Sequence, residues 1–157
     1  MSYRIIGGVE RPRVLFLCVH NSARSQIAEG LLRSMAGDHV VARSAGLEAG
    51  RLRPEAVRVM SELGLDISAQ RSKSVDELAN EHFDIVVTTC DEAKEACPLF
   101  RGAFETLHWG IADPAAVEGS EETRLEAFRE ARDELWAHVA ALSRDLERTQ
   151  FVSSRKR

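Results

Sequence analysis

The feature that most constrains the fold is a continuous apolar run, Val14 to Leu17, which is followed within a few residues by a helical pattern. A run without polar alternation is typical of a strand that is buried on both faces. The helical pattern extends from Ser22 to Met35 and stops before Gly37, a residue type that favours helix ends. A buried strand followed by a crossover helix is the unit from which parallel sheets are built.

The same alternation continues along the chain. Strand patterns occupy residues 40–45, 84–89 and 105–108, the last of them weak, and helical patterns start at Pro54 and after Ser120. The last helix carries an apolar stripe at helical spacing: Leu125, Phe128, Leu135, Val139, Leu142 and Leu146. We therefore predict an α/β fold: a single three-layer domain with a four-stranded parallel sheet flanked by helices.

Two shorter segments carry their own helix signals. The helix that starts at Pro54 is expected to bury an apolar face made of Val57, Met60 and Leu63. Ser74 and Glu77 have the spacing of a capping box, which predicts a short helix there. The two tryptophans, Trp109 and Trp136, are interpreted as packing residues.

A length of 157 residues suits one domain with a proper core. We place this domain at residues 13–147, with an N-terminal extension over residues 1–12 and a C-terminal tail over residues 148–157.

Composition and charge exclude several classes of protein. The formal net charge of -4 argues against a nucleic-acid partner, which would require a basic face. No apolar run approaches the roughly 20 residues of a membrane span, and the N-terminus lacks a signal-peptide core. Three cysteines are too few for a secreted disulfide scaffold and leave one unpaired. We therefore expect a cytoplasmic protein without a membrane partner, in which three cysteines placed at random would simply be small buried hydrophobic residues.

The cysteines are not placed at random. Cys18 ends the first predicted strand and Cys90 ends the third. Because ligands of parallel sheets bind beyond the carboxyl ends of the strands, both thiols are expected at the functional edge of the sheet.

The loop after the first strand has the pattern of an oxyanion site. Five residues separate Cys18 from Arg24, so that backbone N–H groups can wrap around an anion at the start of the helix. Such a nest favours the nucleophilic thiolate, Arg24 can grip two oxygens of a tetrahedral oxyanion, and Ser25 can donate a hydrogen bond to the Cys18 sulfur. Asn21 tolerates the left-handed backbone that such a loop needs. The predicted oxyanion-binding residues are Val19, His20, Asn21, Ser22, Ala23 and Arg24, with His20 interpreted as a loop side chain and not as a base.

From about Arg13 to Leu146 the chain resembles low-molecular-weight tyrosine phosphatases, and still more the arsenate reductases that share their fold. The loop carries the resemblance, together with residues 87–91 (Val-Thr-Thr-Cys-Asp), 96–98 (Ala-Cys-Pro) and 108–115 (His-Trp-Gly-Ile-Ala-Asp-Pro-Ala). Phosphatases of this fold do not need a pair such as Cys90 and Cys97, so the pair is the discriminating feature.

The resemblance implies a relay of three cysteines that reduces arsenate to arsenite for arsenic detoxification. Cys18 would form an adduct with arsenate while Asp113 protonates the departing oxygen, and Cys90 would then attack Cys18 and release arsenite. Cys97 would move the disulfide onward, since two thiols can supply two electrons and a third can exchange. Thioredoxin or another thiol donor would reduce the final disulfide. No bound cofactor is expected, and phosphate and sulfate are expected to bind as well as arsenate.

Two other functions remain open at this point. A tyrosine phosphatase of the same fold would use Cys18, Arg24 and Asp113 and keep the other cysteines for protection. A redox-sensing or oxyanion-binding regulator could use the same thiols, although pure binding needs no general acid. Asp113 itself could be a turn former before Pro114. Relatives with a similar Val-His pair at positions 19–20 use other thiol reductants, which leaves the donor open.

No metal is predicted. The histidines outside the loop show no metal-ligand spacing: His39, His82, His108 and His138. Some relatives bind potassium near the loop, and Asn21, Glu29 and Ser44 match part of that site. Arg71 and Lys73, however, stand where further oxygen ligands would be required, so we expect no potassium requirement.

Overall fold

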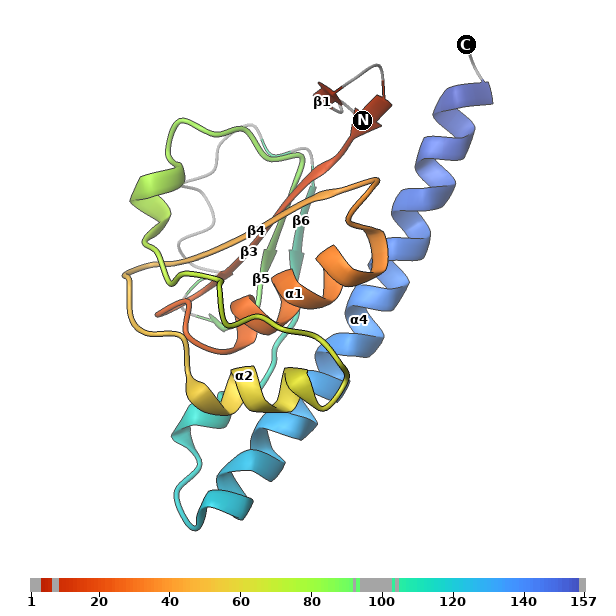
Figure 1. The fold of residues 1–157 in the computed structure, drawn as a ribbon. Coiled ribbons are helices and arrows are strands. Elements are labelled where there is room, and N and C mark those ends of the chain that lie inside the picture. Colours follow the sequence, from red (N-terminus) through yellow and green to blue (C-terminus); the bar gives the residue numbers. More distant parts are fainter. Residues whose placement is uncertain (1–3, 7–8, 92, 94–102, 104, 156–157) are drawn as a thin grey trace.

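The four predicted strands form one parallel sheet. A computed structural model describes residues 4–6, 9–91, 93, 103 and 105–155. The strands are β3 (Arg13–Cys18), β4 (Val41–Gly46), β5 (Ile85–Thr88) and β6 (Glu105–His108), in the order β4-β3-β5-β6 (Figure 1). The predicted α/β class and four-stranded parallel sheet are confirmed.

Strand β3 lies in the interior of the sheet, which explains its continuous apolar sequence. Every residue of β3 is buried. Cys18 pairs with Gly46 of β4 on one side, and Leu17 pairs with Thr88 of β5 on the other. The chain runs from β3 to β4 on one side of β3 and then returns to β5 on the other side. The carboxyl end of β3 is therefore the switch point where ligands of such sheets bind.

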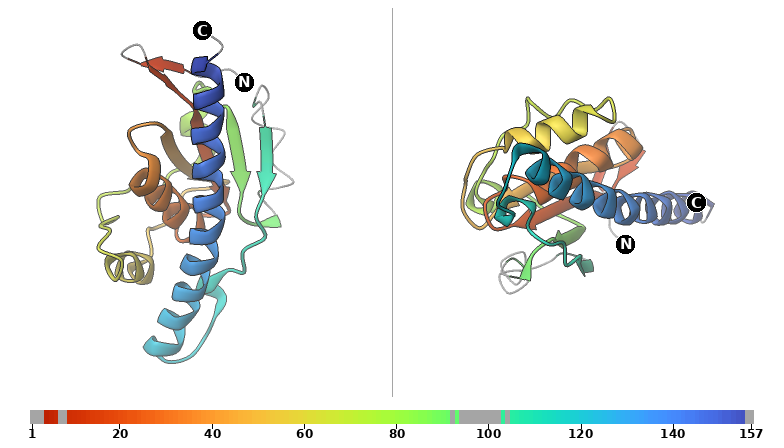
Figure 2. Two further views of the ribbon diagram at one scale, coloured as in Figure 1. Left: turned by 90° about the vertical axis from the view of Figure 1, so that its right-hand side faces the viewer. Right: turned by 90° about the horizontal axis from the view of Figure 1, so that it is seen from below.

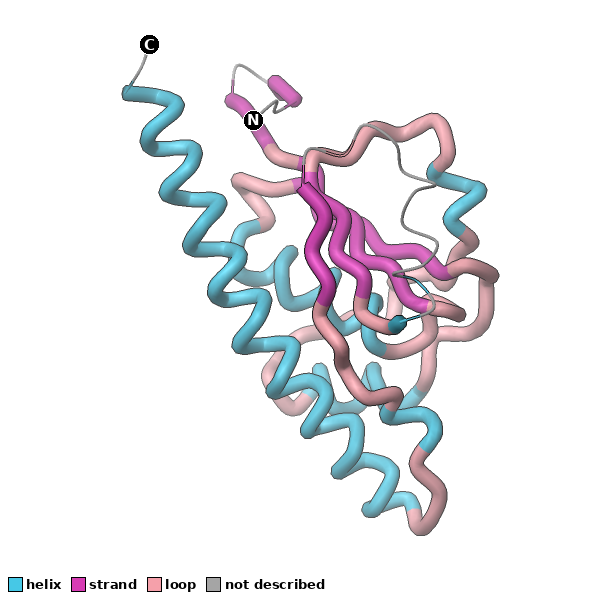
Figure 3. Tube along the Cα trace, turned by 180° about the vertical axis from the view of Figure 1, so that it is seen from behind, coloured by secondary structure: helices cyan, strands magenta, loops and turns pink. Residues whose placement is uncertain are grey.

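The α-helices of the described residues cover one face of the sheet. They are α1 (Arg24–Ala36), α2 (Pro54–Ser61) and α4 (Glu121–Arg155) (Figures 1 and 2). Their buried side chains pack with Phe16 and Val87 of the sheet in one large apolar cluster. The opposite face, seen in Figure 3, carries a short 3-10 helix, η1 (Val75–Leu78), and its apolar cluster includes Cys90 and Ala93. The loop after Cys18 therefore lies at the end of the sheet, between the two apolar clusters.

Several local predictions are confirmed. Pro54 is the first residue of α2. The Ser120 hydroxyl accepts a hydrogen bond from the Thr123 backbone N–H at 3.1 Å and caps α4. The predicted stripe of α4 is buried: Leu125, Phe128, Leu135, Val139, Leu142 and Leu146.

The short helix predicted at Ser74 is confirmed as η1, but three other local predictions are wrong. Leu63 lies beyond the end of α2 and is 44% exposed. Trp136, next to the buried stripe of α4, points away from the core and is 50% exposed. Ser74 caps η1 through the Asp76 N–H, but Glu77 does not close a capping box. The Glu77 carboxylate instead accepts two hydrogen bonds from the Arg71 guanidinium.

Both ends of the chain have more regular structure than the sequence suggested. Strands β1 (Arg4–Ile6) and β2 (Val9–Arg11) form an antiparallel hairpin inside the segment expected as an extension. The Arg11 guanidinium ties it to the domain by donating to the backbone oxygens of Gly37 and Val40. Helix α4 continues to Arg155, past the expected tail boundary, because residues 147–155 contain no glycine or proline (Figure 2).

Candidate active site

The loop between β3 and α1 closes around the Cys18 sulfur. Cys18 is 3% exposed. Its Sγ accepts a hydrogen bond from the Asn21 backbone N–H at 3.2 Å and lies 2.8 Å from the Ser25 hydroxyl. Asn21 has the left-handed backbone predicted for it, with a φ of 52°. The loop thus turns sharply enough to bring a backbone amide and a hydroxyl onto one sulfur atom.

A pocket of about 290 Å³ opens directly over this sulfur. It is lined by Cys18, Val19, His20, Ser22, Ala23, Arg24 and Asp113. The predicted oxyanion-binding residues therefore line one pocket, except for Asn21. Asn21 belongs to the same loop but is fully buried. His20 points outward and pairs with Glu48 at 2.8 Å, as expected for a loop side chain.

Arg24 and Asp113 meet across the mouth of the pocket. One guanidinium nitrogen, Nη1, donates to the Ile111 backbone oxygen at 3.0 Å, and Nη2 lies 3.9 Å from Asp113 Oδ2. The other oxygen of Asp113, Oδ1, accepts from the Ala115 N–H at 3.0 Å and caps the 3-10 helix η3 (Pro114–Ala116). Asp113 is thus both a turn former and a carboxyl group that faces the pocket.

A buried hydrogen-bond network supports the loop from below. The Asn21 side-chain amide donates to the hydroxyls of Ser25 and Ser44 at 2.8 and 2.9 Å, and the Ser44 hydroxyl donates to the Glu29 carboxylate at 3.1 Å. Because the Ser25 oxygen already accepts from Asn21, its proton is free to point at the Cys18 sulfur. This is the orientation that stabilises a thiolate.

The residues that suggested a partial potassium site do not fit a bound cation. Asn21 Oδ1 already accepts from Gln26 Nε2 and from the Lys73 backbone N–H, both at 3.0 Å. The buried Glu29 carboxylate has the Arg33 guanidinium at 3.2 Å and the Lys73 ammonium at 4.0 Å. Burial lowers the pKa of Lys73, while the Glu29 charge opposes this effect. The positive charge that Glu29 requires is supplied by side chains.

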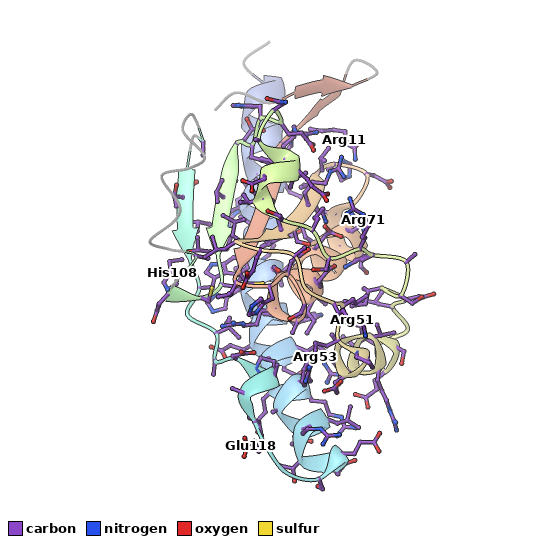
Figure 4. The ribbon with its side chains drawn as sticks, turned by 90° about the vertical axis from the view of Figure 1, so that its left-hand side faces the viewer. Arg11, Arg51, Arg53, Arg71, His108 and Glu118 are labelled. Carbon is purple, nitrogen blue, oxygen red and sulfur yellow. The ribbon has the colours of Figure 1, made fainter. Side chains whose placement is uncertain are left out.

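Arg71, the other expected cation, pairs with a carboxylate outside this network. Its side chain turns to the surface, where it pairs with Glu77 at 2.8 Å (Figure 4). Only its backbone oxygen takes part, by accepting from the Lys73 ammonium at 3.2 Å.

Cys90 lies at the same edge of the sheet as Cys18. Thr88 of β5 pairs with Leu17 of β3, and the Thr89 N–H and hydroxyl both donate to the Leu17 oxygen, at 2.8 and 2.9 Å. Cys90 is the next residue, 4% exposed, and belongs to the same apolar cluster as Cys18. The predicted shared edge is confirmed for these two thiols. Cys97 lies outside the described residues.

Residues 13–152 match the low molecular weight phosphotyrosine protein phosphatase family. The chain belongs to this family. Among its curated relatives is an arsenate reductase of Halalkalibacterium halodurans, 43% identical over 126 residues, which are 80% of this chain and 91% of the relative. An arsenate reductase of Bacillus subtilis is 42% identical over 127 residues, covering 81% of this chain and 91% of the relative.

Solved structures similar to this chain have the same fold. An arsenate reductase in a phosphate-binding state superposes with a TM-score of 0.75 at 30% identity, covering 86% of this chain and 98% of the other. An arginine phosphatase from Geobacillus stearothermophilus superposes with a TM-score of 0.76 at 28% identity, covering 89% and 96%. The solved structures similar to this chain therefore include both an arsenate reductase and a phosphatase.

Two residues that support the family loop were missed in the sequence. A side chain at Gly46 would place its Cβ 2.6 Å from the Val19 oxygen and 2.7 Å from the Asn21 nitrogen, so only glycine fits there. The Ser72 hydroxyl donates to the His20 oxygen at 2.9 Å. A glycine that ends a strand was a usable signal for close approach, whereas no local pattern around Ser72 pointed to the loop.

The remaining aromatic and metal predictions concern residues away from the loop. Trp109 is buried and packs against Phe16 and His138, as expected for a packing residue. Within the described part of the chain, no three His, Cys, Asp or Glu side chains are arranged to hold a metal ion. No described helix has the length and apolar character needed to cross a membrane.

Proposed function

We propose that this chain reduces arsenate to arsenite with electrons from its own cysteines. The observation that carries the proposal is the burial of Cys18 and Cys90 together at the ends of adjacent strands, with an anion pocket over Cys18. Hydrolysis of a phosphoester needs only the first of these thiols. The curated relatives described above as arsenate reductases support the same conclusion.

The first step is binding and attack at the pocket. Arsenate is held by the loop amides and by Arg24, and the Cys18 thiolate attacks arsenic. One arsenic–oxygen bond breaks, Asp113 protonates the departing oxygen, and water leaves. Arsenic stays pentavalent in this step. Phosphate and sulfate bind in the same pocket because they are also tetrahedral oxyanions, and a solved relative is described in a phosphate-binding state.

The second step transfers the electrons. The Cys90 thiolate attacks the Cys18 sulfur, a disulfide forms, and the sulfur–arsenic bond breaks with its electron pair going to arsenic. Two thiols are thereby oxidised, arsenic becomes trivalent, and arsenite leaves. Ser25 stabilises the Cys18 thiolate whenever that sulfur is the attacking or leaving group.

The third step restores the nucleophile. Cys97 attacks Cys90, Cys18 leaves as a thiolate, and a Cys90–Cys97 disulfide is presented to thioredoxin or another thiol donor. No bound cofactor takes part, and the reaction belongs in the cytoplasm, where such donors keep thiols reduced.

Phosphoester hydrolysis is the second candidate. Cys18, Arg24 and Asp113 line one pocket and need no further thiol for hydrolysis. The hydrolytic relative of similar fold favours this alternative. It leaves the position of Cys90 unexplained, and for this reason we rank it second.

One assay separates the two functions. NADPH consumption is followed with arsenate, thioredoxin and thioredoxin reductase, and hydrolysis of an aryl phosphate is measured on the same preparation. We expect arsenate-dependent consumption of NADPH that is well above any phosphate release. Rapid aryl phosphate hydrolysis without arsenate-dependent electron flow would establish the phosphatase instead.

A further inference from the structure

His108 links the end of β6 to the turn that carries Cys90. His108 is the last residue of β6 and pairs with Thr88 of β5 (Figure 4). The Thr88 hydroxyl lies 2.7 Å from His108 Nδ1, and Asp91 Oδ1 lies 3.1 Å from His108 Nε2. Thr88 is fully buried, whereas the Asp91 side chain is 90% exposed. The imidazole thus joins a fixed strand residue to an exposed turn residue.

The two hydrogen bonds define which nitrogen of the His108 imidazole donates and which accepts. A carboxylate can only accept, so His108 Nε2 carries the proton that is shared with Asp91. Nδ1 then accepts from the Thr88 hydroxyl, whose alternative acceptor, the Leu107 oxygen, is more distant at 3.4 Å. Thr88 therefore orients the ring, and the ring holds Asp91.

Asp91 directly follows Cys90, so this contact acts on the position of the second thiol. On one side of Cys90, Thr89 is fixed to the Leu17 oxygen of β3 by two hydrogen bonds. On the other side, Asp91 is fixed to His108 of β6. The Cys90 sulfur also accepts from the Ala93 N–H at 3.4 Å. Cys90 is consequently held between anchors on both neighbouring strands.

We propose that His108 is a positioning residue for the transfer of electrons from Cys90 to Cys18. The proposal rests on the function proposed above and concerns its second step, in which the Cys90–Cys18 bond forms and the sulfur–arsenic bond breaks. A hydrogen bond to so exposed a carboxylate contributes little to stability. Its effect on the rate is larger, because a displaced nucleophile loses its aligned approach to the sulfur that it attacks.

The test isolates this step in a Cys97→Ser background, where the relay stops at the Cys18–Cys90 disulfide. One equivalent of arsenate is added, samples are quenched by alkylation, and mass spectrometry follows the disulfide over time. His108→Ala and Asp91→Ala should each slow its formation by roughly 10- to 100-fold. The double variant should be no slower than either single one, because both remove one interaction. His108→Gln keeps an N–H donor for Asp91 and should restore much of the rate.

Two controls separate positioning from damage to the fold. The alkylation rate of Cys18 by iodoacetamide, without arsenate, reports the loop itself and should stay unchanged in every variant. His82→Ala removes another histidine–aspartate contact, that of exposed His82 with buried Asp84 at 3.4 Å before the start of β5, and should leave the disulfide rate unchanged.

Three outcomes would overturn the proposal. The first is that His108→Ala and Asp91→Ala form the Cys18–Cys90 disulfide as fast as the Cys97→Ser parent. The second is an equal fall in Cys18 alkylation, which would mean that the loop itself was disturbed. The third is an absence of any Cys18–Cys90 disulfide in the Cys97→Ser parent, which would remove the relay and this role together. Only the third also contradicts the proposed function.

Discussion

The ends of β3 and β5 carry one cysteine each but are held in different ways. Around Cys18, the supporting side chains Asn21, Ser25 and Ser44 are fully buried and joined by hydrogen bonds of 2.8 and 2.9 Å. Before Cys90, Thr89 is fixed to the Leu17 oxygen, and after Cys90, Asp91 makes a side-chain contact with His108 although it is 90% exposed. Oxyanion chemistry needs fixed donors, because a preorganised site needs no rearrangement during reaction. A thiol that must bond to one partner and then to another here has a buried anchor before it and an exposed contact after it.

The largest effect on activity is expected from a change at Cys18, at the end of β3. Cys18→Ser should abolish arsenate reduction and also any aryl phosphate hydrolysis, because a hydroxyl in this loop is far less ionised than a thiol. Both activities are measured on the purified variant, and the assay of arsenate-dependent NADPH consumption is the more sensitive of the two. Appreciable turnover in either assay would remove Cys18 from the centre of the chemistry.

Asp113→Asn should have the next largest effect. The amide oxygen can still accept from the Ala115 N–H and cap η3, but the side chain has no proton to transfer. Turnover should therefore fall by about 10²- to 10⁴-fold. Phosphate binding, measured by competition against arsenate, should change little. Near-normal turnover would reduce Asp113 to its turn-forming role.

Ser25→Ala tests the preorganisation of the loop. It removes a hydrogen bond to the Cys18 sulfur, and a bond to a charged group contributes about 1.5–3 kcal/mol, or roughly 10- to 100-fold in rate. Alkylation of Cys18 at neutral pH and arsenate turnover should fall by similar factors. Unchanged alkylation would show that the backbone amides of the loop are sufficient without this hydroxyl.

The smallest effect is expected from potassium. Replacing potassium by choline at constant ionic strength should leave arsenate turnover unchanged, because Arg33 and Lys73 already face the Glu29 carboxylate. A clear rise in activity with potassium would mean that these side chains do not meet the charge requirement of the network.

The sequence predicted the loop at the end of β3 better than the contacts around Cys90, for physical reasons. A continuous apolar run and the spacing from Cys18 to Arg24 are local signals, and they defined the strand, the loop and the helix. The meeting of Asp113 with Arg24 depends on residues almost 90 positions apart, so it followed from the family resemblance and not from any pattern. The contact from Thr88 through His108 to Asp91 depends on the register between β5 and β6, which no local signal encodes. Trp136 was misplaced because hydrophobic character alone does not say which way a residue next to a buried stripe points.

The relay itself is tested most directly by a single addition of arsenate to three proteins. Alkylated peptides of the parent, Cys97→Ser and Cys90→Ser are analysed by mass spectrometry, together with the arsenite formed per enzyme. The account predicts a Cys90–Cys97 disulfide in the parent. In Cys97→Ser it predicts one arsenite and a trapped Cys18–Cys90 disulfide, and in Cys90→Ser it predicts no arsenite, because the reaction stops at the adduct on Cys18. Aryl phosphate hydrolysis, where present, should survive both changes. Normal multiple turnover of Cys97→Ser with thioredoxin would contradict the account and would favour direct attack by an external thiol.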